Sequence, residues 1–542
     1  MTQSDGGTYR VLLTDEIDRE GVELLAAEPR LQVDEVPTLP AAELLERIGD
    51  YDALIGRSAT RITEELLRRG TRLRAVGRAG VGVDNIALDA ATALGVAVIN
   101  APAGNTVAVA ELFFGAVLAA LRHIPDAAAS MRAGRWDRSR LLGGELHGRT
   151  LGIVGLGRIG TEVARRARAF GMPLAGYDPY VGDERFQALH VRRAETLDAL
   201  LAEADVLTVH TPLNDETRGM IGRRELARLP AGALVANLAR GGIVDDAALL
   251  AALQAGDLAG AVLDVYGTEP LPADHPLRAA PNLLLTPHIG ASTAEAQRNV
   301  AVDVCVAVKD ALLSGELSRS LNVAAVTGLE WAALQPSLLV ARRAAALARA
   351  LLADRGVRVV RRLAVRCGPA LAGGGGACLS AAAVGALDGV VETGRLNLIN
   401  ARALAETRGL ELALAESAAL DHPSAVEVTV SGGMESVTVA GVAAPDLPAR
   451  LTRIGSFRVD VTPRQTLVVL TNHDVPGVIG RVGTLLGAAG VNIAEYHQAR
   501  LAQGGEALAA ISVDGTAGEE LRRALLELPD VLSATIVHFG AA

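Results

Sequence analysis

Three side chains in the middle of the chain have the types needed to take a hydride and a proton from a hydroxy acid. Arg240 follows the apolar run ALVANLA, His288 follows NLLLTP, and Glu269 lies 19 residues before His288. A guanidinium can grip a carboxylate through two parallel hydrogen bonds and polarise a neighbouring oxygen. An imidazole exchanges a proton near neutral pH, and a carboxylate beside it fixes the tautomer of the ring. We therefore interpret the three residues as a candidate catalytic set.

Each of these residues also has an ordinary structural explanation. An arginine after a strand can lie on a surface turn, an acid before Pro270 can belong to a loop, and a lone histidine is more often structural than catalytic. The chemical interpretation is favoured because all three follow predicted strands, and the carboxyl ends of parallel strands meet where ligands bind. His123, His147 and His538 are not part of any comparable group of catalytic side chains, and no histidine lies in an HExxH or Cys/His pattern. We therefore expect no metal site.

Residues 151–178 have the spacing of a dinucleotide-binding unit. The segment LGIVGLGRIGTEVARRARAFGMPLAGYD reads as a strand, a Gly155-x-Gly157-x-x-Gly160 turn, a helix and a second strand that ends at Asp178. The first glycine permits the turn, the second leaves room for a pyrophosphate at the helix N-terminus, and the third lets the helix pack closely. The acid can accept hydrogen bonds from the adenosine ribose and would repel a 2′-phosphate. The unit therefore predicts NAD, with a glycine turn used only for packing as the alternative.

Short apolar strands alternate with amphipathic helices on both sides of this unit, which is typical of α/β parallel sheets. Strands are expected at YRVLLTD, DALIG, LRAVG and VAVIN before residue 101, and six strands between 151 and 286 suffice for a doubly wound sheet. Asp264 and Thr211 also stand at strand ends, where they would face the cofactor. The expected helices span residues 107–121, 196–203, 223–229, 245–255 and 293–313.

The C-terminal part of the chain reads as two further domains. Residues 317–460 are rich in Ala and Gly, carry the run Gly373–Gly376, which we expect to be flexible, and have strand-like segments around an Ala-rich helical centre. They predict a separate α/β domain. Residues 466–542 have the order βαββαβ of the ferredoxin-like split unit, which suits the binding of a small ligand or of a second copy.

Composition excludes several other functions. The chain has 542 residues, half of them apolar, and a net charge of −10, which argues against nucleic acid or an anionic membrane as partner. The apolar run 112–121 is shorter than the roughly 20 residues of a membrane span. Residues 1–8 lack the apolar segment of a signal peptide and read as a tail, so we expect a cytoplasmic protein. Cys305, Cys367 and Cys378 show no CxxC spacing and are expected to be reduced.

The motifs GLGRIG, NLARGGIVDD, DVYGTEP and TPHIGAST occur in the order and spacing of a known family. The chain resembles the D-2-hydroxyacid dehydrogenases over essentially its whole length, and GRSAT, VGRAGVGVDN and NAPAGNTVAVAEL fit as well. The terminal unit, with TNHDVPGVIGRVGTLLGAAGVNIAEY, is similar to an ACT regulatory domain. The resemblance implies a Rossmann-type NAD domain inserted in a discontinuous flavodoxin-like substrate domain, with hinge helices near 107–121 and 293–313. The implied ranges are 1–100 and 288–318 for the substrate domain, 101–287 for the NAD domain, 319–460 for an intervening (allosteric substrate-binding) domain and 461–542 for the ACT domain.

The resemblance also implies roles for particular residues. It makes Arg240, Glu269 and His288 catalytic. Arg57 and Arg78 would face the substrate from the other lobe, Asn105 would lie in the same cleft, and guanidinium groups suit a phosphorylated acid. The implied cofactor contacts are Gly155, Gly157, Arg158, Ile159, Gly160, Asp178, Thr211, Ala239, Arg240, Asp264, His288, Gly290 and Ala291.

For the ACT-like unit, the resemblance implies that L-serine binds between paired copies. Asp474 would take the amine, while Asn472 and Asn492 would hold the carboxylate. Two pairs of arginines stay open: Arg138 and Arg140 as phosphate ligands or a solvated loop, and Arg450 and Arg453 as a second anion site.

The implied function is NAD-dependent oxidation of 3-phospho-D-glycerate to 3-phosphooxypyruvate, the first step of L-serine biosynthesis, in a homotetramer with serine feedback. Two alternatives stay open. One is another D-2-hydroxyacid dehydrogenase, or a side activity that reduces 2-oxoglutarate. The other is a non-catalytic protein that senses NAD or amino acids. The presence of Arg240, Glu269 and His288 counts against this last alternative, because a sensor needs no proton carrier.

Overall fold

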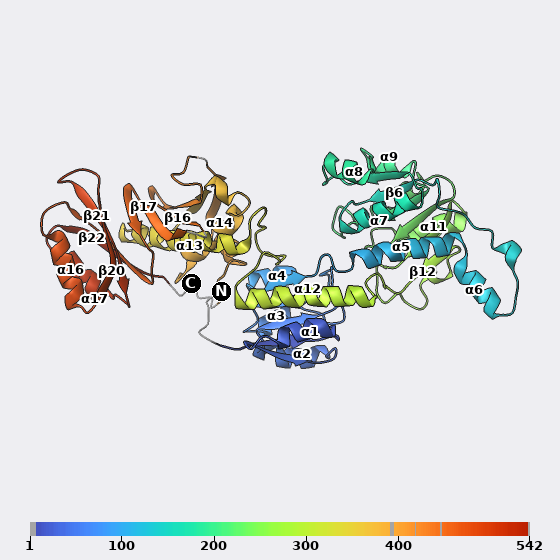
Figure 1. Ribbon diagram of the computed structural model, residues 1–542, viewed down its shortest axis with the longest axis horizontal. Coiled ribbons are helices and arrows are strands. Elements are labelled where there is room, and N and C mark those ends of the chain that lie inside the picture. Colours follow the sequence, from blue (N-terminus) through green and yellow to red (C-terminus); the bar gives the residue numbers. More distant parts are fainter. Residues whose placement is uncertain (1–6, 391–394, 418, 445–446, 540–542) are drawn as a thin grey trace.

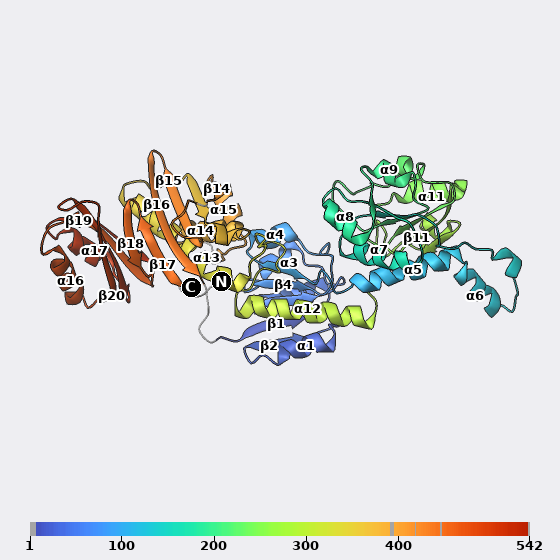
Figure 2. The ribbon, with the colours of Figure 1, turned by 45° about the horizontal axis from the view of Figure 1, so that its top comes forward.

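Four β-sheets follow one another along an elongated molecule (Figure 1). The computed structural model describes residues 7–390, 395–417, 419–444 and 447–539. Most of the N-terminal tail expected from the sequence, residues 1–6, therefore lies outside the described residues. The N-terminal sheet is drawn in blue and the glycine-turn unit in green, with the two C-terminal units in yellow to red on the opposite side of the N-terminal sheet (Figure 2).

The first lobe is a parallel sheet of five strands in the order β2-β1-β3-β4-β5. Helix α12 returns from far along the chain to pack on α1 and β4. The sequence predicts four of the strands; β2, LQVDE, is a largely polar edge strand with no apolar run to reveal it. The elements of this lobe are β1 (Tyr9–Leu13), α1 (Arg19–Ala26), β2 (Leu31–Glu35), α2 (Ala41–Arg47), η1 (Ile48–Asp50), β3 (Ala53–Gly56), α3 (Glu64–Arg69), β4 (Ala75–Arg78), α4 (Leu88–Ala93), β5 (Ala97–Asn100) and α12 (Ala294–Leu313).

The second lobe is a parallel sheet of seven strands in the order β12-β11-β10-β9-β6-β7-β8. This is the doubly wound order, with the switch point between β6 and β9, and it confirms the predicted fold class. The six expected strands are present, and the seventh, β8, is a two-residue edge strand without apolar residues. The elements are α5 (Thr106–Leu121), α6 (Ile124–Arg132), η2 (Arg138–Arg140), β6 (Leu151–Val154), α7 (Arg158–Ala169), β7 (Leu174–Tyr177), α8 (Asp183–Leu189), β8 (Arg192–Arg193), α9 (Leu197–Leu201), β9 (Val206–Val209), α10 (Arg223–Leu226), β10 (Ala233–Asn237), α11 (Asp246–Ala255), β11 (Leu258–Leu263), η3 (Pro276–Ala279) and β12 (Leu283–Leu285).

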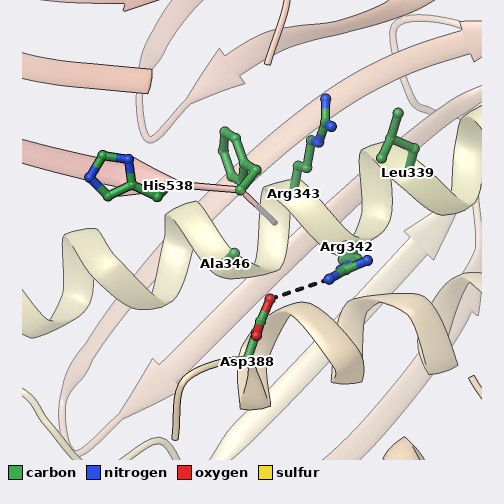
Figure 3. Close-up of a pocket in the computed structure, with 7 residues that line it drawn as sticks. Leu339, Arg342, Arg343, Ala346, Asp388 and His538 are labelled. Carbon is green, nitrogen blue, oxygen red and sulfur yellow. Dashed lines mark hydrogen bonds and ion pairs between the residues drawn. The ribbon is translucent and has the colours of Figure 1, made fainter. Parts of the chain in front are cut away.

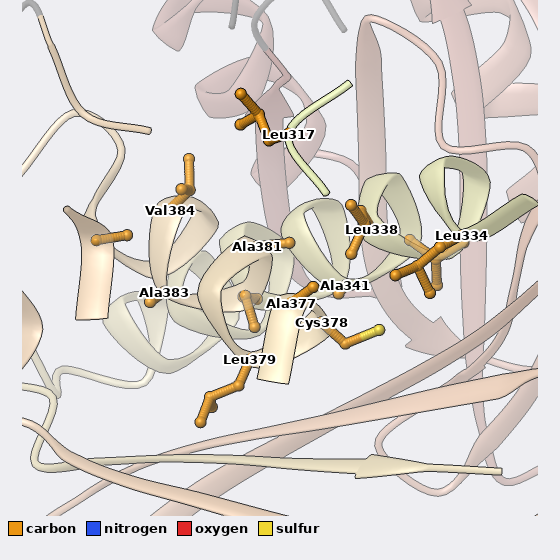
Figure 4. Close-up of a cluster of buried hydrophobic side chains, with 14 of the residues drawn as sticks. Leu317, Leu334, Leu338, Ala341, Ala377, Cys378, Leu379, Ala381, Ala383 and Val384 are labelled. Carbon is orange, nitrogen blue, oxygen red and sulfur yellow. The ribbon is translucent and has the colours of Figure 1, made fainter. Parts of the chain in front are cut away.

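The third unit is a six-stranded mixed sheet covered by two Ala-rich helices. Its order is β14-β13-β15-β16-β17-β18, and only β13 and β14 are parallel. Helices α13 and α14 lie side by side, with small side chains between them (Figure 4). The elements are α13 (Trp331–Asp354), β13 (Arg362–Cys367), η4 (Pro369–Leu371), α14 (Gly375–Leu387), α15 (Ala401–Thr407), β14 (Glu411–Glu416), β15 (Ala425–Gly432), β16 (Glu435–Ala444), β17 (Leu447–Ile454) and β18 (Phe457–Val461).

The glycine run of this unit is not a flexible segment, contrary to the expectation from the sequence. Gly373 and Gly374 form the tightly packed turn before α14, and Gly375 and Gly376 are the first residues of the helix. A Cβ at Gly373 would collide with the carbonyl oxygen of Thr327, and one at Gly374 would lie 2.9 Å from a methyl group of Leu334. The glycines are therefore needed for close approach, which composition does not distinguish from flexibility.

The fourth unit has the predicted βαββαβ order and an antiparallel sheet, β20-β21-β19-β22. Both of its helices lie on the outer face of the sheet (Figure 1). The elements are β19 (Thr466–His473), α16 (Val478–Ala488), β20 (Asn492–Arg500), β21 (Glu506–Asp514), α17 (Glu519–Leu526) and β22 (Val531–His538).

A continuous set of buried apolar side chains runs from the first lobe through α12, α13 and α14 into β19 and β22. The second lobe has separate cores of its own. Cys305, Cys367 and Cys378 are free thiols, and all three are buried. Among the described helices, none alone is long and apolar enough to cross a membrane; only α5 and α6 taken together, with a bend of 63°, have the required length and composition.

Candidate active site

His288 and Glu269 form a hydrogen-bonded pair just after the last strands of the second lobe. The Nδ1 atom of His288 lies 2.6 Å from one carboxylate oxygen of Glu269, and the other oxygen accepts the backbone N–H of Tyr266 at 2.9 Å. With Glu269 ionised, Nδ1 carries the proton and Nε2 is free to accept one. The imidazole is about half exposed, at 49%. The structure thus brings the predicted base and its orienting acid together.

Asp264 holds the loop that carries His288. Its carboxylate is fully buried and accepts hydrogen bonds from the Thr286 hydroxyl (2.6 Å) and from the N–H groups of Ile289 and Gly290 (both 2.8 Å). The contact of Asp264 with the nicotinamide end of the cofactor stays a prediction, and in the structure its oxygens bind groups of the protein. Its side chain therefore fixes the backbone around His288.

Tyr266, in the motif DVYGTEP, was missed by the sequence analysis. Its hydroxyl donates to the carbonyl oxygen of Thr286 at 2.7 Å, and burial raises its pKa to about 12. The ring therefore joins the loop after β11 to the loop that precedes His288. The position of Tyr266 two residues beyond Asp264 was the available signal.

Arg240 reaches from the second lobe to the first. Its Nε donates to Asp84 at 3.1 Å and its Nη1 to the carbonyl oxygen of Ala239 at 2.7 Å. Asn237 braces this turn by donating to the Arg240 carbonyl oxygen and accepting from the Ala239 N–H. A Cβ at Gly82 would collide with the guanidinium. Asp84 was missed by the sequence analysis, although it lies inside the motif VGRAGVGVDN.

Arg57 and Arg78 stand close to Arg240. The pKa of Arg78 is lowered to about 10, mainly by burial and then by the positive charges of Arg57 and Arg240; the carboxylates of Asp84 and Asp15 oppose this shift only in part. Arg78 donates to the carbonyl oxygen of Ala79, and its Nε has no partner among the described residues. Three guanidinium groups with only two neighbouring carboxylates acting on Arg78 have the charge to bind a strongly charged anion.

Two predicted residues near this site have buried polar atoms without a partner among the described residues. They are the Oδ1 atom of Asn105, at the start of α5, and the hydroxyl of Thr211, after β9. Thr211 lies beside the glycine turn, since a Cβ at Gly155 would be 3.0 Å from its methyl group. Buried polar atoms normally have partners. Both atoms are therefore free to bind a ligand.

The glycine turn has the geometry that its spacing predicts. Gly155 has φ 91°, Gly157 precedes α7 with open space where a Cβ would stand, and a Cβ at Gly160 would collide with the Gly155 carbonyl oxygen. Asp178 accepts the backbone N–H of Leu156 at 2.9 Å, so its carboxylate lies next to the turn. Arg158 and Ile159 are the first residues of α7, which begins directly after Gly157. The turn therefore fits the pyrophosphate of NAD.

Substituting Gly157 and Gly160 separately tests this fit. Gly157→Ala adds a methyl group only to the open space, so we expect normal thermal stability but a Kd for NAD about ten- to hundredfold higher, or ~1.4–2.7 kcal/mol. Gly160→Ala forces α7 away from the turn and is expected to destabilise the protein by about 2 kcal/mol. Titration with NAD and thermal unfolding measure the two effects. An unchanged Kd in Gly157→Ala would show that the phosphates do not bind at this turn.

His210, next to Thr211, makes part of the stability depend on pH. Burial lowers its pKa to about 4, so the folded protein binds fewer protons there than the unfolded chain between pH 6.5 and 4. The stability linked to the neutral His210 is therefore fully present above pH 6.5 and is lost as the pH falls towards 4. Urea unfolding measures how far the free energy of unfolding falls between pH 7 and pH 5. We expect this fall to be about 2 kcal/mol smaller in His210→Gln than in the unaltered protein. The exposed control His147→Gln should behave like the unaltered protein, and equal losses in all three would refute a buried neutral His210.

The predicted serine contacts lie at opposite ends of β20. Asn472 is buried at the end of β19, and Asp474 pairs with Arg500 at 3.2 Å, where β20 ends. Asn492 begins β20 and donates to Asp514 at 2.7 Å. Eight residues of strand span about 26 Å. One chain therefore does not bring the three together, and a site that uses all of them needs residues from two copies.

Arg450 and Arg453 are already matched by acids of the chain. Arg450 pairs with Asp460 and with Glu495 of the fourth unit, and Arg453 pairs with the buried Glu427. The structure therefore does not show a free anion site there.

Arg138 and Arg140 lie in η2, on an exposed loop beyond α6. Helix α6 is at the end of the second lobe that faces away from the first lobe (Figure 1). The structure does not bring these two arginines to the Arg57, Arg78 and Arg240 cluster. Among the described residues, there is also no group of three or more His, Cys, Asp or Glu side chains that could hold a metal ion.

Comparisons with known proteins agree with this geometry. Residues 114–290 match the family model of the D-isomer specific 2-hydroxyacid dehydrogenase NAD binding domain. The chain is 38% identical to the D-3-phosphoglycerate dehydrogenase of Bacillus subtilis (strain 168), over 98% of this chain and 99% of that protein. It is 35% identical to the D-3-phosphoglycerate dehydrogenase of Methanocaldococcus jannaschii, over the same shares.

Solved structures match a little over half of the chain. The TT0316 protein from Thermus thermophilus has a TM-score of 0.54 at 37% identity, and it covers 58% of this chain and 99% of its own. The NAD+-bound 3-phosphoglycerate dehydrogenase of Entamoeba histolytica has a TM-score of 0.50 at 27% identity, with 58% of this chain and 99% of its own covered. With a relative 38% identical over nearly the full length of both chains, this chain belongs to the NAD-dependent D-isomer specific 2-hydroxyacid dehydrogenases, among the D-3-phosphoglycerate dehydrogenases.

Proposed function

We propose that this enzyme oxidises 3-phospho-D-glycerate to 3-phosphooxypyruvate with NAD, as the first step of L-serine biosynthesis. The observation that carries the proposal is the mutual proximity of Arg57, Arg78 and Arg240, two of which lower the pKa of the third. Gly241, next to Arg240, packs against the backbone of Tyr266, whose N–H binds the Glu269 that pairs with His288. A phosphorylated hydroxy acid carries two anionic groups, and three guanidinium groups match them better than they match a monocarboxylate. The close relatives that bear the D-3-phosphoglycerate dehydrogenase name support this substrate.

In the proposed reaction, Arg240 binds the substrate carboxylate and polarises the oxygen on C2. The Nε2 atom of His288 takes the hydroxyl proton as the C–H bond breaks, so the C–O bond becomes a carbonyl. NAD, when bound, supplies the acceptor for the hydride. Glu269 holds Nδ1–H and stabilises the imidazolium that forms, while Arg57 and Arg78 hold the phosphate.

The division into domains follows from the same proposal. We assign the substrate domain to residues 1–100 and 288–318, the NAD domain to 101–287, the intervening domain to 319–460 and the ACT domain to 461–542. The contacts of α12 with the first lobe support the discontinuous substrate domain. The chain also contacts that lobe beyond residue 318, because Asn322 accepts the N–H of Val98 at 3.0 Å. Helices α5 and α12 would then act as the hinges.

We further propose that L-serine inhibits the enzyme by binding between ACT domains of paired copies in a homotetramer. The placement of Asn492 and Asp474 at opposite ends of β20 supports a shared site. The intervening domain contacts both the ACT domain and the substrate domain, so a movement of one can reach the other through it. On one side Asp354 of α13 accepts from Arg522 and Thr535, and on the other Asn397 donates to the carbonyl oxygen of Gly95 at 2.7 Å.

Side chains near β22 add to these contacts. Leu339, Arg342, Arg343 and Ala346 of α13 line a small pocket with Asp388, His538 and Phe539 (Figure 3). Arg342 pairs with Asp388 at 3.3 Å, and Arg343 donates to the carbonyl oxygen of Pro463. Because α13 also packs on α14, a shift of the ACT sheet would move the intervening domain.

Removing the charge of Asp474 tests the feedback. We expect Asp474→Asn to raise the serine concentration for half-inhibition at least about tenfold, because a charged group that binds the amine contributes ~1.5–3 kcal/mol. Uninhibited turnover should not change. The control Glu520→Gln removes one negative charge from the exposed surface of α17 and should retain inhibition. Equal inhibition in all three proteins, or none in the unaltered enzyme, would contradict the serine site.

The substrate itself is tested by NADH formation at alkaline pH with 3-phospho-D-glycerate or D-lactate, and by NADH consumption with 2-oxoglutarate. We expect the highest kcat/KM with the phosphorylated acid. Faster turnover of lactate or of 2-oxoglutarate would assign the enzyme to another reaction of the same family.

A further inference from the structure

Asp84 is the one residue of the first lobe whose carboxylate is bonded to a proposed catalytic group in the described structure. It accepts the Nε–H of Arg240 at 3.1 Å, although the two residues are 156 positions apart. Asp84 belongs to the loop after β4, while Arg240 follows β10 in the second lobe. The two lobes are therefore joined through the same guanidinium that the proposed reaction needs for the substrate.

The loop that carries Asp84 is firmly held. Asn85 donates to the carbonyl oxygens of Arg57 (3.0 Å) and Thr60 (2.7 Å), and Asn100 donates to that of Val81. The carboxylate itself is 70% exposed. A fixed backbone thus presents an acid to Arg240, but solvent reaches the ion pair and weakens it. Arg240 can therefore release Asp84 and bind the carboxylate of a ligand instead.

The charges around the pair favour an anion at this position. Arg57, Arg78 and Arg240 repel one another, and Asp84 and Asp15 are the acids that offset their effect on Arg78. The carboxylate of Asp15 is already used, because it accepts the backbone N–H groups of Arg57 and Thr60. Asp84 is the more exposed of the two acids, and it is the one that contacts Arg240.

We propose that Asp84 occupies Arg240 in the substrate-free enzyme and is displaced by the substrate carboxylate, so that it sets the affinity for the hydroxy acid. Asp84 is thus a positioning residue that acts through Arg240. It also keeps small inorganic anions from occupying the arginine cluster, because an anion must first compete with it. This inference rests on the proposed role of Arg240 in binding the substrate.

The variant Asp84→Asn tests the displacement. We expect KM for 3-phospho-D-glycerate to fall about three- to tenfold, kcat to stay within about twofold, and the inhibition constant of sulfate to fall by a similar factor. Asp89→Asn removes one charge from the same lobe at an exposed position on α4 and is expected to change none of these values. Thermal unfolding of both variants checks that they fold normally.

The other outcomes separate the inference from the proposed function. A higher KM in Asp84→Asn would overturn the displacement, since Asp84 would then hold Arg240 ready for substrate, and an unchanged KM would overturn it as well. If no hydroxy acid turned over even in the unaltered enzyme, the proposed function would fail. Sulfate binding, measured by thermal shift in both proteins, would still decide whether Asp84 competes for the cluster.

Discussion

Replacing His288 with asparagine is expected to lower kcat by about a thousandfold, within the range of general acid–base catalysis, and to leave the Kd for NAD within about twofold. The reason is the pairing of its Nδ1 atom with Glu269 at 2.6 Å, which leaves Nε2 as the proton acceptor. Asparagine has no group that takes a proton at neutral pH. It does tolerate the left-handed backbone that His288 adopts, with φ 53°. The loss should therefore fall on chemistry rather than on folding.

A matched control exists in the same lobe. His190 also has a left-handed backbone, with φ 52°, and ends α8 at the surface. His190→Asn should retain full kcat. Steady-state kinetics and NAD titration of both variants measure the contrast. Retention of more than about a tenth of kcat in His288→Asn would show that another group carries the proton.

Arg240→Gln is expected to lower kcat/KM by about a thousandfold. A charged partner removed from a hydrogen-bonded pair costs 2–5 kcal/mol, and about 4 kcal/mol corresponds to this factor. KM and kcat should both suffer, because the guanidinium binds the carboxylate and polarises the C2 oxygen. Asp84 would lose its partner, but its carboxylate is exposed, so stability should change little.

The exposed Arg228 provides the control for this substitution. It lies in the same lobe and pairs with Asp198 at 3.1 Å. Arg228→Gln should keep kcat/KM within about twofold, since surface ion pairs contribute little. A loss of less than tenfold in Arg240→Gln would mean that Arg57 and Arg78 hold the carboxylate instead.

The parts of the fold that apolar periodicity encodes could be predicted from the sequence. Buried parallel strands are nearly continuous apolar runs, so the six strands from β6 to β12 other than β8 were found. Strands β2 and β8 lie at sheet edges and are mostly polar, so they give no such signal. Gly373–Gly376 was misread because composition is the same for a flexible run and for a close helix contact.

The candidate site was predictable where it follows strand ends. Glu269 and His288 lie after neighbouring strands, and their pairing follows from that topology. The hydrogen bond between Arg240 and Asp84 could not be predicted, because it joins two lobes. The pattern of apolar residues predicts helices and strands but not how two lobes lie relative to each other. The same holds for Asp264, whose strand-end position predicts a site but not which atoms its oxygens bind.

Selection of a phosphorylated acid by the arginine cluster is tested most directly by comparing kcat/KM for 3-phospho-D-glycerate and D-glycerate. NAD is kept in excess, and NADH formation is followed by absorbance. The two acids differ only in the phosphate that Arg57 and Arg78 are proposed to hold beside Arg240. We predict at least a hundredfold preference for the phosphorylated acid, about 2.7 kcal/mol, which lies within the range for a desolvated charge pair. Equal or faster turnover of D-glycerate would contradict the proposal that the arginine cluster selects a phosphorylated substrate.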